Sequence, residues 1–177
     1  GKTKMRAIVD DTFQSGISVV NASPTNKSNL YSNLVIEKVI VKNWAQYGIN
    51  IYGDLARGIS IRNSKILSNG IAHDRLSVGA GIVVTRGPGK VRIEGNTITG
   101  NKGSGIFQSS AGLDSDDFTV SGNDIADNGG DGIQFTEEAH YGATATSRTY
   151  NVAIFGNKLL RNRTNGIRVG TFDNVGR

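Results

Sequence analysis

The stretch that decides the fold is Val120–Ile133, which reads V-S-G-N-D-I-A-D-N-G-G-D-G-I. The same spacing of 13 residues separates equivalent positions in three other places: Ile36 to Ile49, Ile93 to Ile106 and Ile154 to Ile167. A further copy starts at Ile61, but its spacing to the closing Gly-Ile is 21 residues. Self-similarity at a fixed register indicates a solenoid, in which each unit buries its apolar side chains only against its neighbours.

The copies share residue types that suit corners. Three of them carry Gly-Asn before an apolar residue, then a second Asn, then the closing Gly-Ile (Gly95-Asn96, Gly122-Asn123 and Gly156-Asn157; Asn101, Asn128 and Asn162). Between the corners, apolar residues alternate over three to five positions, which is typical of short strands. Gly and Asn tolerate the left-handed backbone of a sharp bend, and stacked Asn side chains can bond to one another. We therefore expect these Asn residues to take left-handed conformations at the corners and to form a ladder.

Three short strands per copy predict one rung of an all-β parallel β-helix with about six rungs, three short parallel sheets and little or no helix. Six strands follow a Gly-Ile pair, and we call their sheet the G-I sheet. Its inward column is predicted to be Ile49, Ile82, Ile106, Ile133 and Ile167. One domain over 1–177 is expected. Because strand-like sequence reaches both ends, we expect either a piece of a longer chain or ends covered by flanking domains or by partner chains, as in a homotrimer.

Composition excludes several classes of function. The net charge is +5, but the Lys and Arg residues are scattered, so nucleic acid is not expected as a partner. No apolar run approaches the ~18 residues of a membrane span. The chain has no cysteine, so it has no disulfides.

The pattern G-N-x-I followed by N-x-x-x-G-I resembles the pectate-lyase-like superfamily, and the resemblance covers nearly the whole chain. Members include pectin and alginate lyases, galacturonases, mannuronan C5-epimerases and phage tailspike depolymerases. The resemblance implies a right-handed coil, a polysaccharide ligand, most often anionic, and a location outside the cell, on the cell surface or on a virion. It does not by itself select one activity.

Within that group, Tyr47-Gly48-Ile49-Asn50-Ile51-Tyr52 is similar to the epimerase stretch Tyr-Gly-Phe-Asp-Pro-His. The segment 81–87, which contains Arg86, also resembles that family. The catalytic Asp of the family corresponds to Asn50 and its catalytic His to Tyr52. Asn can neither neutralise a uronate carboxylate by charge nor act as a base, whereas a Tyr can act as a base.

Alternation predicts which side chains of the G-I sheet point outward. One row is Ser18, Asn50, Val83, Phe107, Gln134 and Arg168, and the next is Val20, Tyr52, Thr85, Ser109, Thr136 and Gly170. Aromatic and polar groups on a long flat face can stack on sugars and bond to their hydroxyls. The same rows would also suit a solvated face that binds nothing.

Two departures from the repeat concentrate titratable groups. Thr136–Tyr141 opens the longest loop and contains Glu137, Glu138 and His140. Two carboxylates and a His could supply the acid and the base for cleavage of a glycosidic bond. The insertion Gly70–Ala80 adds His73 and Arg75 on the opposite flank, and Arg suits a sugar carboxylate. Either segment could equally be an ordinary polar loop.

Other features give weaker predictions. Asp114, Asp116 and Asp117 could hold Ca²⁺ through oxygen ligands, although the stretch lacks the Gly and distal Glu of an EF-hand loop and the G-G-x-G-x-D nonapeptide. Neither another cofactor nor a metal site is expected. Trp44 follows a strand and is predicted to pack at a corner rather than to form an exposed platform for a sugar.

Two functions remain open. The first is a module that processes an acidic polysaccharide by lyase, epimerase or hydrolase chemistry, and it is the one that we favour. Its catalytic candidates are Tyr52, Glu137, Glu138 and His140, and its substrate-binding candidates are Asn50, His73, Arg75, Arg86, Phe107, Gln134 and Arg168. The alternative is a non-catalytic glycan-binding or structural β-helix of a tailspike or surface adhesin. A scaffold with no ligand is less consistent with the irregular loops.

Overall fold

The computed structural model describes residues 15–20, 31–53, 56–71, 79–110, 115–138 and 149–172. Every regular element in these ranges is a strand, and the strands form three parallel sheets with one short additional pair, β2 (Tyr31–Ser32) and β6 (Ala56–Arg57). Sheet 1, the G-I sheet, consists of β1 (Ile17–Val20), β5 (Ile49–Tyr52), β9 (Ile82–Thr85), β12 (Ile106–Ser109), β15 (Ile133–Glu138) and β18 (Ile167–Phe172).

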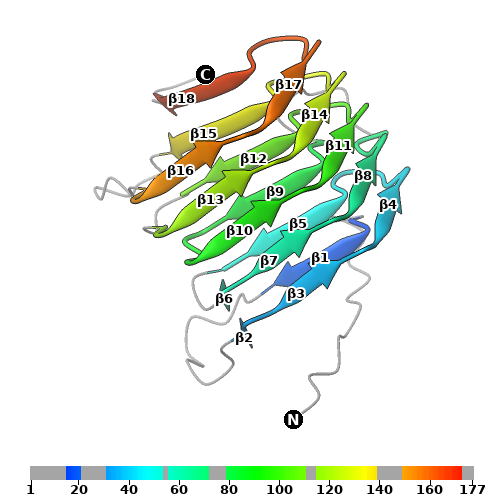
Figure 1. The fold of residues 1–177 in the computed structure, drawn as a ribbon. Coiled ribbons are helices and arrows are strands. Elements are labelled where there is room, and N and C mark those ends of the chain that lie inside the picture. Colours follow the sequence, from blue (N-terminus) through cyan, green and yellow to red (C-terminus); the bar gives the residue numbers. More distant parts are fainter. Residues whose placement is uncertain are drawn as a thin grey trace.

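The other two sheets have five strands each. Sheet 2 consists of β3 (Val35–Glu37), β7 (Ser60–Arg62), β10 (Val91–Glu94), β13 (Phe118–Ser121) and β16 (Val152–Phe155). Sheet 3 consists of β4 (Ile40–Lys42), β8 (Lys65–Leu67), β11 (Thr97–Thr99), β14 (Asp124–Ala126) and β17 (Lys158–Leu160). The chain runs from sheet 2 to sheet 3 to sheet 1 and then begins the next rung (Figure 1). The predicted right-handed parallel β-helix is confirmed.

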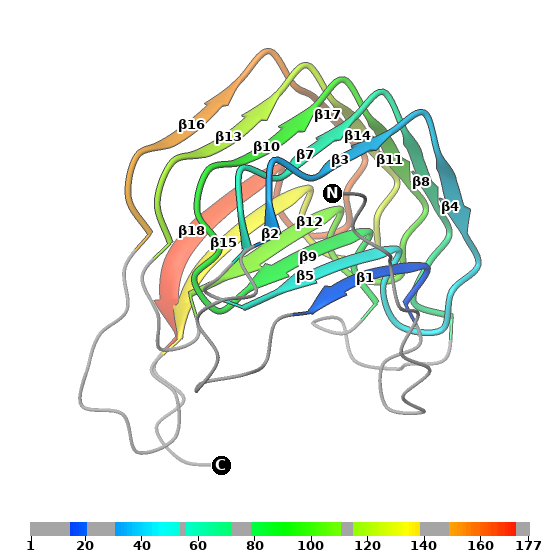
Figure 2. The same ribbon diagram turned by 90° about the horizontal axis from the view of Figure 1, so that it is seen from below.

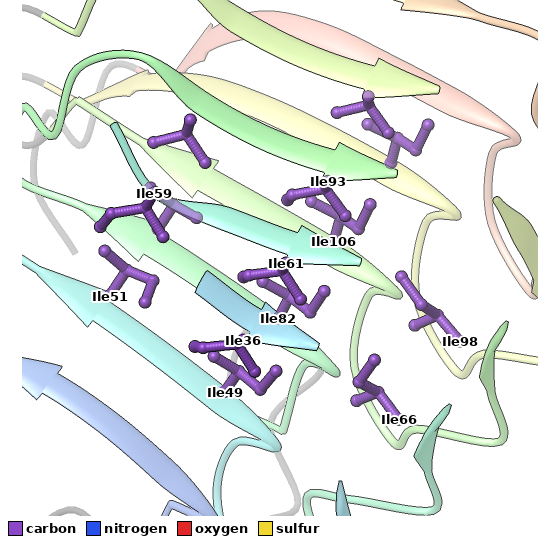
Figure 3. Close-up of a cluster of buried hydrophobic side chains, with 14 of the residues drawn as sticks. Ile36, Ile49, Ile51, Ile59, Ile61, Ile66, Ile82, Ile93, Ile98 and Ile106 are labelled. Atoms are coloured by element: carbon purple, nitrogen blue, oxygen red, sulfur yellow. The ribbon is translucent and has the colours of Figure 1, made fainter. Parts of the chain in front are cut away.

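The three sheets surround the interior of the coil (Figure 2). Stacked apolar side chains fill this interior. Equivalent Ile residues lie above one another because the strands pair in register, so Ile49 pairs with Ile82 and Ile106 pairs with both Ile82 and Ile133. These four side chains are fully buried. So are the side chains labelled in Figure 3 from the central rungs of the other two sheets: Ile61 and Ile93 in sheet 2, and Ile66 and Ile98 in sheet 3. Burial of one such side chain contributes roughly 1.5–3 kcal/mol. In the last rung the same column ends at Ile167, which is 46% exposed.

Two asparagine ladders run along the coil, as predicted. One joins Asn96, Asn123 and Asn157, and the other joins Asn69, Asn101, Asn128 and Asn162. In the second ladder, Asn101 Nδ2 donates to Asn128 Oδ1 at 2.9 Å and to the carbonyl of Ile66 at 3.3 Å. The Oδ1 of Asn101 accepts both the backbone N–H and the Nδ2 of Asn69. Each amide therefore satisfies backbone groups of its own corner and binds the next rung.

The predicted backbone conformation of these Asn residues is wrong. None of the ladder Asn residues has a positive φ; the residue before it does, and Gly95, Gly100 and Asp127 have φ values of 64°, 68° and 55°. The left-handed residue makes the bend, and the Asn that follows presents its amide to the coil interior. The Asn residues are thus required for their side-chain hydrogen bonds rather than for their tolerance of a left-handed backbone.

The Gly of each Gly-Ile pair is required by space. A Cβ on Gly81 would lie 2.8 Å from the carbonyl oxygen of Gly105 and 2.8 Å from Asn101 Nδ2. Gly105 meets the equivalent atoms one rung further on, at Gly132 and Asn128. Because the Asn ladder and the glycine column pack against each other, the two halves of the repeat occur together in the sequence.

The long copy of the repeat accommodates its insertion through a narrow neck. Gly70 and Gly79 both have positive φ, at 89° and 109°, and a Cβ on Gly70 would overlap the backbone of Gly79. The rung on the far side of the neck is bonded without interruption, since the N–H of Lys102 donates to Asn69 O and that of Gly103 to Gly79 O. The insertion therefore leaves and re-enters the coil without altering the register.

Candidate functional site

The two outward rows predicted for sheet 1 are confirmed in register. Asn50 pairs with Val83, Phe107 pairs with Val83 and Gln134, and Gln134 pairs with Arg168. The second row follows in the same way, from Tyr52 through Thr85 to Ser109, Thr136 and Gly170. Neighbours within a row are one strand apart, about 4.8 Å.

The prediction that these rows form a flat open face is wrong in the centre of the sheet. Asn50 is 4% exposed, Val83 3%, Ser109 1% and Thr136 2%. Alternation gives the direction of a side chain but not its exposure, and this face is covered over much of its length. Tyr52, Thr85, Phe107 and Arg168 remain partly exposed. Burial also raises the pKa of the Tyr47 phenol, in the stretch that leads to Asn50, which keeps that group protonated.

Tyr52 and Arg86 meet where sheet 1 gives way to its connection with sheet 2. The guanidinium carbon of Arg86 lies 5.3 Å from the centre of the Tyr52 ring, within cation–π range. Tyr52 is in register with Thr85, and Arg86 follows Thr85 directly with a φ of 62°. The backbone N–H of Arg86 donates to Ser109 O at 3.2 Å, which fixes this corner to the next rung.

Asp131 and Arg168 form a second charged cluster at the opposite border of sheet 1. Asp131 is 2% exposed, and its Oδ1 accepts hydrogen bonds from Thr164 Oγ1 and from both the backbone N–H and the Nδ2 of Asn165. Its Oδ2 lies 3.8 Å from Arg168 Nη1. Since Oδ1 is tied to the next rung, the orientation of Oδ2 toward Arg168 is fixed.

Gln134 joins this cluster through the preceding rung. Its Oε1 accepts a hydrogen bond from Ser104 Oγ at 2.9 Å, and it is 9% exposed. Gln134 and Arg168 were predicted to bind substrate, and the structure brings them together with Asp131, which was not. Its signal was available in the repeat. Among the Gly-Ile pairs that open the strands of sheet 1, the preceding residue is uncharged in the other copies and is an Asp only in this one; the others are Ser15, Tyr47, Ala80, Ser104 and Asn165.

Comparison with known proteins identifies the fold family. The family model described as a right-handed beta helix region matches residues 8–175. The chain belongs to this family. Neither a search of curated proteins nor a search of solved structures found a match.

In this β-helix, the segment with the predicted catalytic residues begins as a strand, so the prediction that Thr136 opens a loop is wrong. Thr136, Glu137 and Glu138 continue β15, and Glu138 pairs with Phe172 of β18. Pairing with a sixth strand extends β15 beyond the four residues that β9 and β12 have. The side chains of both Glu residues, and all of His73, Arg75 and His140, lie outside the described part.

The register separates the predicted catalytic residues along the axis. Tyr52 belongs to β5, whereas Glu137 belongs to β15, three strands away in sheet 1. Their backbones are therefore separated by roughly 14 Å. This spacing disfavours a single acid–base pair made of Tyr52 and Glu137. Arg86, which follows β9, is only two strands from Glu137, or roughly 10 Å.

The remaining features of this β-helix do not join the site. Asp116 pairs with Arg57 and Asp117 accepts from Asn151, while Asp114 lies outside the described residues. Within the described ranges, no group of three or more His, Cys, Asp or Glu side chains could hold a metal ion. Nor does that part of the chain contain a helix with the length and apolarity to cross a membrane.

Trp44 occupies the position where the following rungs have a ladder Asn, and its backbone N–H donates to Asn69 Oδ1 at 3.2 Å. Its indole covers Gly16, where a Cβ would lie 2.5 Å from Trp44 Nε1, yet the residue is 42% exposed. The predicted corner packing is therefore present, but it leaves the residue partly open to solvent.

Proposed function

We propose that this protein binds an anionic polysaccharide at the parts of the outer face of sheet 1 that stay exposed. The observation that supports this proposal is a pair of guanidinium groups, Arg86 and Arg168, held at this sheet three strands apart. Their spacing along the axis is roughly 14 Å. Arg binds carboxylates through paired hydrogen bonds. Two such groups at this spacing suit a polymer with repeated carboxylates better than a single small acid.

Each guanidinium is oriented before any ligand arrives. Arg86 stacks on the Tyr52 ring, an arrangement that leaves its N–H groups in the guanidinium plane and directed sideways. Arg168 is oriented by the buried carboxylate of Asp131. Side chains that are already ordered lose less entropy on binding, and this raises affinity.

Uncharged groups between the two guanidinium groups suit the sugar rings themselves. Phe107 lies in the row that ends at Arg168 and is partly exposed, so its ring can contact the apolar face of a sugar. Thr85 is also partly exposed, next to Tyr52, and offers a hydroxyl. Aromatic area with a few placed polar groups is typical of saccharide sites.

The test is a binding titration with polygalacturonate and alginate as acidic polymers and dextran as a neutral one. The variants Arg86→Ala and Arg168→Ala should each weaken binding of the acidic polymers by about 10- to 100-fold, because each removes charge-assisted hydrogen bonds. Lys65→Ala, which removes an equal charge from the outer face of sheet 3, is the matched control and should have little effect. If all three variants lost the same affinity for the acidic polymers, the binding would be non-specific attraction between charges. Binding of dextran as tight as that of alginate would contradict the proposal.

Processing of the bound glycan by lyase, epimerase or hydrolase chemistry is the second candidate function. The observation that favours it is the position of Glu137 and Glu138 at the end of β15, two strands from Arg86. The backbone of this strand end is roughly 10 Å from that of Arg86 along the axis. The readouts are the ultraviolet absorbance of unsaturated sugars, new reducing ends and epimer ratios. Glu137→Gln, Glu138→Gln, His140→Ala or Tyr52→Phe should lower turnover by at least about 100-fold with binding retained. Binding without any turnover in the unaltered protein would leave only the first function.

A further inference from the structure

A polar pocket opens on the outer face of sheet 2, on a different side of the coil from sheet 1. Its volume is about 350 Å³, and its lining residues are Lys90, Arg92, Asp117, Thr119 and Asn151. They come from three consecutive rungs, at the starts of β10, β13 and β16, which lie side by side in Figure 2. None of these residues was singled out in the sequence for binding to a saccharide.

The pocket is built from two columns of side chains. Lys90, Asp117 and Asn151 are corner residues with φ values of 56°, 54° and 52°, each placed just before its strand. Arg92 and Thr119 form the second column, since they pair in register on the outward side of β10 and β13. Adjacent members of a column are about 4.8 Å apart. The five polar groups therefore converge on one short stretch of the surface.

The corner column carries polar side chains at left-handed positions. The corner between sheets 2 and 3 does the same in its first rungs, at Lys38 and Asn63, and has glycine in the later ones, at Gly95, Gly122 and Gly156. A left-handed backbone is strained for residues with a Cβ, and least so for Asn and Asp. At Lys90 the chain accepts that strain and keeps a cationic side chain at the pocket.

The charges of the pocket are only partly compensated. Neither Lys90 nor Arg92 forms an ion pair or side-chain hydrogen bond with the described part of the chain, and both are exposed. The nearby cations of the same sheet face are paired, Arg57 with Asp116 and Arg62 with Glu37. The carboxylate of Asp117 accepts from Asn151 Nδ2 at 3.1 Å. Two cations thus stand beside one carboxylate, one amide and one hydroxyl.

We propose that this pocket binds one uronic acid residue of a glycan. Its carboxylate would bond to Arg92 and Lys90, while its hydroxyls would donate to Asp117 and bond to Asn151 and Thr119. A simple inorganic anion would gain from the two cations but would be repelled by Asp117, and a neutral sugar would not use the cations. The volume lies near the lower end for ligand sites, which suits one or two sugar residues.

The site adds to the proposed function, on which it rests, and it is separate from the sheet 1 face. Arg86 and Lys90 lie at the two ends of the connection between β9 and β10. A polysaccharide that binds Arg86 at the border of sheet 1 could therefore continue around the corner of the coil to this pocket. The pocket would then hold an additional residue of the same acidic chain.

The test uses trigalacturonate as the probe, with inorganic phosphate as the comparison anion, and follows the backbone amides of 90–92 and 117–119 and the Arg92 side chain by NMR. Saturable shifts are expected at these groups, and Lys90→Ala or Arg92→Ala should weaken the response at least about 10-fold. The double variant Arg86→Ala/Arg168→Ala should leave it intact, which separates this site from the sheet 1 face. Lys65→Ala is again the control for charge.

Asp117→Asn decides whether the pocket recognises a sugar or only an anion. Asn accepts a left-handed backbone readily, so this variant should fold. The variant should weaken the binding of trigalacturonate, because the pocket loses an acceptor for the sugar hydroxyls. It should strengthen the binding of phosphate, because the pocket loses a repulsive charge. If Asp117→Asn strengthens both probes, or if Lys90→Ala and Arg92→Ala bind trigalacturonate unchanged, the proposal is wrong.

Discussion

The corners of the coil and the outer face of sheet 1 come from the same rungs, but the constraints on residue type differ between them. At a corner, Asn101 has Asn69 and Asn128 as its neighbours, and each makes the same bonds. On the outer face, Asn50 is followed in register by Val83, whose next neighbour is Phe107. Where a side chain must stack on its own copy, the sequence repeats. Where a side chain points outward from sheet 1 and need not match the next rung, the residue can differ from rung to rung without loss of the fold.

The largest expected effect is on the stacked interior. Ile133→Asp places a carboxylate in a fully buried column, so it should destabilise the fold by more than about 4 kcal/mol and leave little soluble folded protein. Ile167→Asp, at the end of the same column and 46% exposed, is the matched control and should be far milder. Circular dichroism and thermal unfolding would measure both. Equal behaviour of the two variants would mean that the column does not carry the stability.

A smaller effect is expected at the ladder. Asn101→Ala would leave buried donors of Asn69 and the carbonyl of Ile66 without their partner, which should cost about 3 kcal/mol. Asn162→Ala removes the end of the same ladder, where the amide is only partly buried, and should cost about half as much. Urea denaturation would compare them. If Asn162→Ala were the more destabilising of the two, the ladder would not be held together by its buried members.

The glycine column should be more tolerant still. Gly105 does not have a positive φ, so Gly105→Ala tests space alone: the new Cβ would meet Gly132 O at 2.7 Å and Ile125 Cγ2 at 2.6 Å. Displacement of these neighbours should cost about 2 kcal/mol. At Gly170 a Cβ meets nothing within 4 Å, and Gly170→Ala should be nearly neutral. Matching unfolding midpoints for the two variants would contradict the steric role.

The sequence predicts the residues that stack from rung to rung better than those that do not repeat. The strands, the register and both ladders were predictable because Ile, Asn and Gly recur at one spacing. The φ values at the corners were not, since Gly100 and Asp127 bend equivalent chain segments with different residue types. Burial of Asn50 depends on what covers the sheet, which alternation does not report. The pairing of Arg168 with Asp131 and the pocket around Arg92 arise from single residues that interrupt the repeat.

The smallest effect is expected at an exposed ion pair on the corner between sheets 3 and 1. A hydrogen bond from Arg161, at 2.7 Å from its Nε, and the charge of that guanidinium hold the pKa of Asp127 below its usual value. A carboxyl whose pKa is lowered in the folded state adds stability above its unfolded pKa of about 4, and this contribution is lost as the pH falls through the folded pKa. Asp127→Asn should therefore be slightly less stable than the unaltered protein at pH 7, and the difference should vanish in acid once the pH is below the folded pKa. Because both side chains are exposed, salt should also reduce the difference at pH 7. Because Asn also tolerates the left-handed backbone of this corner, where φ is 55°, a difference that persists in acid would show that the loss does not come from the charge.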